Sequence, residues 1–151
     1  MFVRTNGPEL KQIVTDARKS VVNAEDRISK QMQGIPFVPN SGTHVVSASI
    51  SLAVAQGHLA EADLFVPGKS VGFIIGRVFP AHLNVYQAKH VLSGALGSAR
   101  AGEKLVRQAD AILDTMPGTI NDTPSPTDLA KVDSLLRAAI VKFDKSLQQA
   151  G

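Results

Sequence analysis

The two side chains best placed to do chemistry are Arg77 and His82, which have four residues between them. They lie in residues 66–82 (VPGKSVGFIIGRVFPAH), the densest run of large apolar residues in the chain. Arginine keeps its positive charge in proteins, whereas histidine changes its charge near neutral pH. The pair therefore suits an anionic partner. The same residues also fit a structural role, in which Arg77 extends its charge out of an apolar segment and His82 caps the next helix.

The Arg-x4-His spacing resembles that of the HEPN family of small helical ribonucleases. The resemblance implies a dimer in which Arg77 and His82 from two subunits form a composite site for metal-independent RNA cleavage, with the histidine as general acid or base. It covers six of the 151 residues. Val78 stands where the family usually has a polar residue, and Pro80 interrupts the helix that would carry the pair.

A positively charged region surrounds this stretch, because residues 64–102 contain no Asp or Glu. The candidate residues for binding an anion or a partner all belong to it: Lys69, Arg77, His82, Lys89 and His90. Grouped on one face, they would form a belt for an anionic partner, such as a small ligand at a subunit junction. Scattered, they would only solvate the surface. The net charge of +3 and the lack of a dense Lys/Arg stripe argue against a nucleic-acid-binding protein.

Other chemical motifs are incomplete. Residues 67–70 (PGKS) match the end of a phosphate-binding loop, but Asp63 stands where that motif needs its first glycine. His58 and Glu61 share a helix face, whereas a metal site needs three or four converging ligands. The chain has no cysteine, which excludes a thiolate ligand or nucleophile. We therefore predict neither a metal nor a cofactor.

Hydrophobic periodicity predicts an all-α fold, a compact bundle of four to five helices in one domain over residues 1–151. Amphipathic patterns define the first and the last helix. The first is expected to follow an Asn6 cap, to begin near Pro8 and to end at Gly34. The last should run from a Ser125 cap to about Gln149.

Three helices are predicted between these two, over residues 43–64, 71–79 and 81–116. The second is the least certain in type, because its β-branched and aromatic composition also suits a strand. The third contains Gly94, Gly97 and Gly102, and glycine is unfavourable inside a helix. We therefore expect a bend or a break within residues 94–102.

The helix over residues 43–64 is apolar on nearly all sides, which predicts burial on most sides. That burial could come from a central place in one bundle or from association between subunits. One apolar stripe contains Val46, Ile50, Ala53, Val54, Gly57, Ala60 and Leu64. A second contains Val45, Ala48, Leu52, Ala55 and Leu59.

These patterns favour a non-enzymatic helical assembly or interaction protein that forms a homo-oligomer, with a structural or scaffold role. Residues 43–79 are more apolar than one modest bundle needs, and Ser, Ala and Gly let helices approach closely. The predicted interface residues are Ile50, Val54, Gly57, Gly72, Phe73 and Gly76. The ribonuclease and the binder of a small anionic ligand remain as alternatives.

Localisation is predicted from the absence of targeting signals. The first residues, MFVRTNGPELKQ, contain no apolar segment of the kind found in a signal peptide. The longest apolar runs are shorter than a membrane span requires. Together with the lack of cysteine, these features lead us to expect a soluble, cytoplasmic protein without a membrane partner.

Overall fold

The computed structural model is all-helical over the residues it describes, which are 2–34, 43–61, 79–116 and 124–150. Side chains are described for residues 9–34, 44–61, 94–116 and 124–150. In chain order the helices are α1 (Phe2–Met32), α2 (Thr43–Glu61), α4 (Phe79–Asp114) and α5 (Pro126–Gln149). The predicted short helix over residues 71–79 falls almost entirely outside the described residues, so its type stays a prediction.

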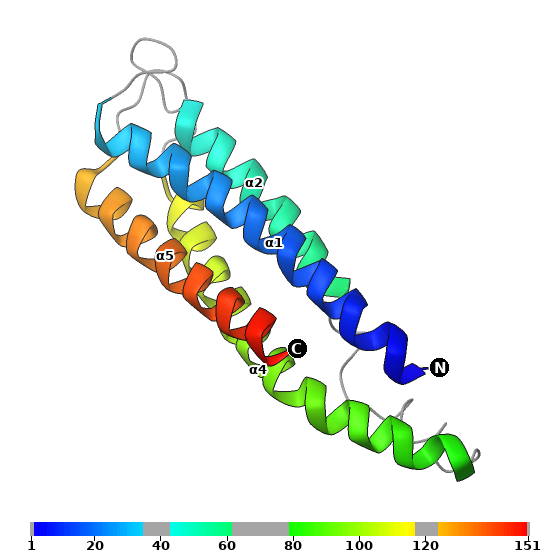
Figure 1. The fold of residues 1–151 in the computed structure, drawn as a ribbon. Coiled ribbons are helices and arrows are strands. Elements are labelled where there is room, and N and C mark those ends of the chain that lie inside the picture. Colours follow the sequence, from blue (N-terminus) through cyan, green and yellow to red (C-terminus); the bar gives the residue numbers. More distant parts are fainter. Residues whose placement is uncertain (1, 35–42, 62–78, 117–123, 151) are drawn as a thin grey trace.

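The helices form a bundle with alternating directions (Figure 1). Going round it, α1 packs on α2, α2 on α4, α4 on α5 and α5 on α1, while α1 and α4 also meet across the middle. Polar contacts show that α1 and α5 run antiparallel. Arg18 on α1 bonds to Asp144 on α5, and Glu25, further along α1, pairs with the earlier residue Arg137 on α5.

The core is built from one stripe on each helix, whose residues recur at alternating steps of three and four once the buried Gly102 is counted on α4. This spacing is typical of helices that pack at a small crossing angle, with side chains of one helix between those of the next. The stripes are Leu10, Val14, Ala17, Val21, Ala24 and Ile28 on α1; Val45, Ala48, Leu52, Ala55 and Leu59 on α2; Ala95, Ala99, Val106, Ala109, Leu113 and Met116 along and just after α4; and Leu129, Val132, Leu136, Ala139 and Phe143 on α5.

The ends of the helices mostly follow from local sequence. Ser125 caps α5 by accepting a hydrogen bond from the Asp128 N–H at 3.4 Å, and Pro126 follows at the first helical position, as predicted. Gly34 has a φ of 71° just after α1, which confirms it as the predicted C-terminal stop.

The predicted start of α1 is wrong. The helix begins at Phe2, so Asn6 and Pro8 lie inside it and Asn6 is not its cap. A proline in the second turn removes one backbone hydrogen bond and crowds the carbonyl four residues earlier, at a cost of about 3 kcal/mol. The stripe that begins at Leu10 packs the following turns against the rest of the core.

α4 is one continuous helix of 36 residues, without a break at its glycines. Its axis changes direction about midway along its length in Figure 1, as the predicted bend requires. Gly94 on α4 lies beside Gln149, the last residue of α5. The part of α4 before Gly94 therefore runs beyond the end of α5, by about 22 Å at the usual helical rise.

Candidate assembly surface

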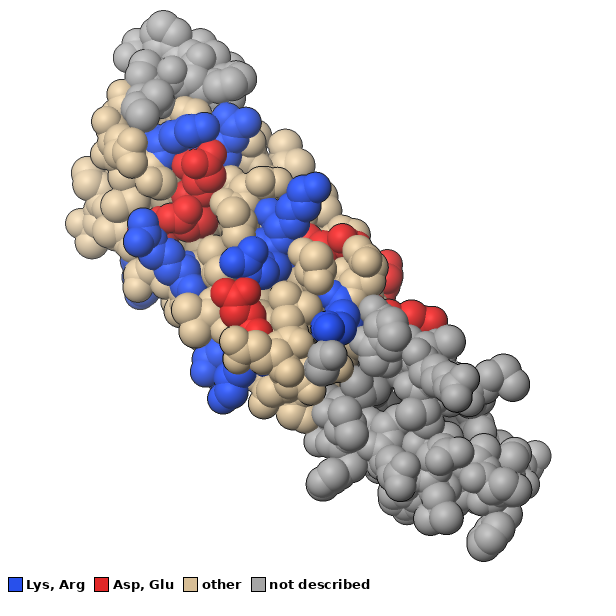
Figure 2. Space-filling view, in the orientation of Figure 1, with Lys and Arg blue, Asp and Glu red and all other residues tan. Residues whose placement is uncertain are grey.

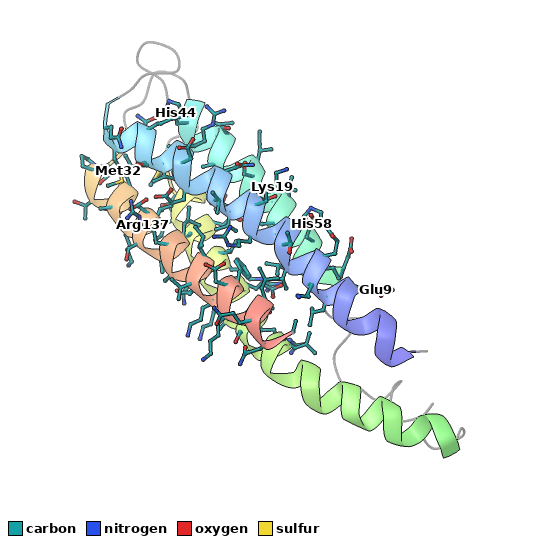
Figure 3. All side chains as sticks on the ribbon, in the orientation of Figure 1. Glu9, Lys19, Met32, His44, His58 and Arg137 are labelled. Atoms are coloured by element: carbon teal, nitrogen blue, oxygen red, sulfur yellow. The ribbon has the colours of Figure 1, made fainter. Side chains whose placement is uncertain are left out.

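The most distinctive surface among the described residues is the outer side of α2, whose two ends are marked by His44 and His58 in Figure 3. Its exposed residues recur along one side of the helix, and all but the last residue of the helix, Glu61, are apolar or glycine. We call the following set the α2 face: Val46, Ile50, Ala53, Val54, Gly57 and Ala60. The exposed fractions of Val46, Ile50 and Val54 are 42%, 62% and 49%.

The other helices present a different kind of outer surface. On α1 the exposed positions from residue 9 to residue 26 are all polar or charged: Glu9, Gln12, Thr15, Lys19, Asn23 and Asp26. Figure 2 shows Lys, Arg, Asp and Glu spread over the face formed by α1 and α5. The remaining large apolar residues that are exposed in the described part of the chain, Met32 and Val141, belong to different helices.

The structure decides which of the two predicted stripes on α2 is buried. The stripe from Val45 to Leu59 enters the core, whereas the stripe from Val46 to Ala60 faces solvent. The predicted burial on most sides is therefore met only in part by the single chain, and burial of the second stripe by association stays a prediction. α2 lies between α1 and α4, and these neighbours cover only one side of it.

The predicted interface residues divide into two groups. Ile50, Val54 and Gly57 are brought together on the α2 face, within two turns of each other. The remaining three, Gly72, Phe73 and Gly76, lie outside the described residues. Sequence reasoning placed Val46, Ala53 and Ala60 on the same stripe but did not include them among the interface residues. Their spacing was the signal that could have added them.

The predicted anion-binding and catalytic residues are not brought together by the described part of the structure. Lys69 and Arg77 lie outside the described residues. His82, Lys89 and His90 belong to the first half of α4, where only the backbone is described. His82 is the fourth residue of α4, so it lies inside the helix and does not precede it as a cap.

A seam of charged residues joins α1 to α5 on the side shown in Figure 3, where Arg137 is labelled. The Arg137 Nε donates to Glu25 Oε1 at 3.2 Å and approaches Asp133 Oδ2 at 3.0 Å. Further along, Arg18 Nε bonds to Asp144 Oδ1 at 2.6 Å. In each pair at least one side chain is more than a third exposed, so the ion pairs contribute little to stability, about 0–1 kcal/mol each.

The seam raises the pKa of Glu25. Partial burial raises the pKa of the Glu25 carboxyl, and the adjacent Asp133 carboxylate raises it further, against an opposing effect of Arg137. The two acids and one arginine bind each other across the helix interface. This arrangement is that of a structural contact, because it leaves the arginine engaged by carboxylates of the same chain.

Metal-binding clusters and membrane-spanning helices are absent from the part of the chain that the structure describes. No three His, Asp or Glu residues converge there in a way that could hold a metal ion. None of the described helices is both long enough and apolar enough to cross a membrane. His58 and Glu61 thus have no third ligand beside them among these residues.

Comparison with known proteins gives no relative. No family model matches the sequence, no curated protein matches it, and no solved structure matches the fold.

Proposed function

We propose that this chain is a non-enzymatic assembly protein that associates with copies of itself through the α2 face. The observation that carries the proposal is the outward placement of Val46, Ile50 and Val54 on successive turns of one helix. Single exposed apolar residues are normal on proteins, but a continuous row on one helix is typical of an interaction surface. The polar outer side of α1 gives the contrast within the same molecule.

The burial available at the α2 face is too small to give micromolar association by itself. Burying a Val or Ile side chain completely contributes about 1.5–3 kcal/mol, so each half-exposed residue offers roughly 1 kcal/mol. Three such residues on each of two copies would give about 6 kcal/mol. Association costs about 4 kcal/mol or more in lost freedom of motion. We therefore expect the α2 face to need help from flanking surfaces for association at micromolar concentration.

Replacing Ile50 with aspartate tests the proposal. Ile50→Asp places a charge at the most exposed large residue of the α2 face, and it should abolish self-association while the helical content stays unchanged. Molar mass by light scattering at micromolar concentrations gives the measurement. The wild-type chain should exceed the 16.0 kDa of one chain, and the variant should equal it.

Val141→Asp is the matched control, because Val141 is 64% exposed and lies on α5. It introduces the same charge at the same degree of exposure, away from α2, and should leave the mass at the wild-type value. A wild-type mass of 16.0 kDa throughout the micromolar range would refute self-association.

A further inference from the structure

We propose that the α2 face is covered by the α2 face of a second copy, with the two helices side by side in opposite directions. This inference rests on the proposed function and adds the partner's position to it. It follows from how side-chain size and charge are distributed along the face.

Side-chain size changes along the α2 face. The N-terminal half carries the large residues Val46 and Ile50, and the C-terminal half ends in the small residues Gly57 and Ala60. Ala53 lies midway. Among the described residues, no atom outside the neighbouring helix backbone lies within 4 Å of the position that a Cβ at residue 57 would take. The packing of the described helices therefore leaves the space over Gly57 open.

An antiparallel pair matches large residues with small ones. With Ala53 near the two-fold axis, Val46 of one copy lies opposite Ala60 of the other, and Ile50 lies opposite Gly57. A parallel pair would instead place Ile50 against Ile50 and leave a gap between the two Gly57 residues. Close packing without voids favours the antiparallel arrangement, which is also the isologous contact of a two-fold dimer.

Charge favours the same direction. Glu61 is the only acidic or basic residue in α2 apart from its histidines, and it is exposed at the C-terminal end. In the antiparallel pair Glu61 approaches the first turn of the other α2, which begins at Thr43 and contains no acidic residue of its own. A carboxylate is favourable there because the first backbone N–H groups of a helix carry partial positive charge. A parallel pair would bring the two Glu61 carboxylates together.

The α2 face alone is smaller than a stable dimer interface, so other surfaces must contribute to the contact. A helix of 19 residues is about 28 Å long, and a strip about 10 Å wide along it covers roughly 280 Å². A stable interface usually buries about 800 Å² on each partner. Because α2 lies between α1 and α4, an α2 pair also brings the adjoining sides of those helices towards the second copy. We expect these sides to supply the remaining contact area.

Cysteine crosslinking tests the direction directly, because the chain has no native cysteine. Three variants, Val46→Cys, Ala53→Cys and Ala60→Cys, are oxidised singly and as an equimolar mixture of the first and third. A disulfide requires Cα atoms about 4.4–6.8 Å apart. In the antiparallel pair, the two copies of residue 60 are about 21 Å apart along the helices.

The expected result is a mixed disulfide between Val46→Cys and Ala60→Cys chains, a self-disulfide of Ala53→Cys, and none of Ala60→Cys alone. Val141→Cys serves as the control for random collision and should give no disulfide. A self-disulfide of Ala60→Cys without the mixed product would overturn the antiparallel pair. So would a dimer mass by light scattering with no disulfide in any variant, although self-association itself would then stand. A single-chain mass at all concentrations would remove both proposals.

Discussion

At the scale of single residues, Gly102 controls how closely α4 packs on α5. A Cβ atom at this position would lie 2.6 Å from Cε1 of the buried Phe143 ring. We expect Gly102→Ala to lower the free energy of unfolding by about 1–3 kcal/mol, because the ring and the helix must move apart. Urea denaturation followed by circular dichroism measures the change.

Gly97 provides the control for this prediction. It is exposed on the same helix, and among the described residues no atom outside the neighbouring helix backbone lies within 4 Å of the place its Cβ would take. Gly97→Ala should raise the free energy of unfolding by about 0.5–1 kcal/mol through better helix propensity. Equal shifts in the same direction for both variants would contradict the role assigned to Phe143.

A second prediction at this scale concerns Glu25, whose pKa is raised in the folded chain by burial and by Asp133. A raised pKa means that the folded chain binds a proton more tightly than the unfolded chain does. The stability contributed by protonation is present at low pH and is lost as the pH rises through the raised value. Relative to Glu25→Gln, the wild-type chain should therefore gain stability as the pH falls from 7 towards 4.

The measurement is the free energy of unfolding of both chains at several pH values in that range. Lys30 pairs with Asp26 on the exposed side of α1, and Asp26→Asn serves as the control for removing a carboxylate without burial. Relative to Asp26→Asn, the wild-type chain should not gain free energy of unfolding as the pH falls. A wild-type chain that loses stability relative to Glu25→Gln on acidification would show that Arg137 dominates over burial.

At the scale of elements, most helix ends could be predicted from the sequence, whereas the side of α2 that its neighbours bury could not. Caps and stops at Ser125 and Gly34 were predictable, because each depends on a few adjacent residues. The outward side of α2 was not, since both of its stripes are apolar and only the positions of α1 and α4 distinguish them. The start of α1 was missed for a related reason: Asn6 and Pro8 are good local start signals, but a helix can continue through them.

The α2 face gives the prediction at this scale. Gly57→Leu fills the space that Ile50 of the second copy would occupy. We therefore expect it to weaken self-association more than tenfold. It should not destabilise the single chain, because position 57 is open and leucine is a better helix former than glycine. Sedimentation equilibrium measures the association constant.

Gly97→Leu is the matched control for this substitution. Position 97 is equally open and also lies within a helix, but on α4. An unchanged association constant is expected for it. If Gly57→Leu associates as strongly as the wild-type chain, the second copy does not pack over Gly57.

At the scale of the whole molecule, the all-helical class followed from periodicity, and the structure shows four helices in the described residues. The regularity of the α4 core stripe was hidden in the sequence by Gly102. Counted as a core position, this glycine completes steps of four and three from Ala95 through Ala99 to Val106. A glycine has no side chain that would mark it as hydrophobic in the sequence. Its place in the core is recognised only in the structure, where the Phe143 ring occupies the space beside it.

Self-association also predicts how the whole molecule responds to heating. A dimer melts at a temperature that depends on protein concentration, because unfolding then includes dissociation. We expect the Tm of the wild-type chain to rise by roughly 2 °C for each tenfold increase in concentration. The Tm of Ile50→Asp should stay constant. Scanning calorimetry at several concentrations measures both, and a constant wild-type Tm would contradict association in the folded state.

The length of α4 has a consequence for how the protein moves through solution. A helix of 36 residues measures about 54 Å along its axis. A compact chain of 151 residues has a radius of gyration near 15 Å, so its diameter is clearly shorter than this helix. A molecule this elongated experiences more friction than a sphere of equal mass and leaves a gel-filtration column early. A single chain will therefore resemble a larger globular species by elution volume, and its frictional ratio should be clearly above that of a sphere.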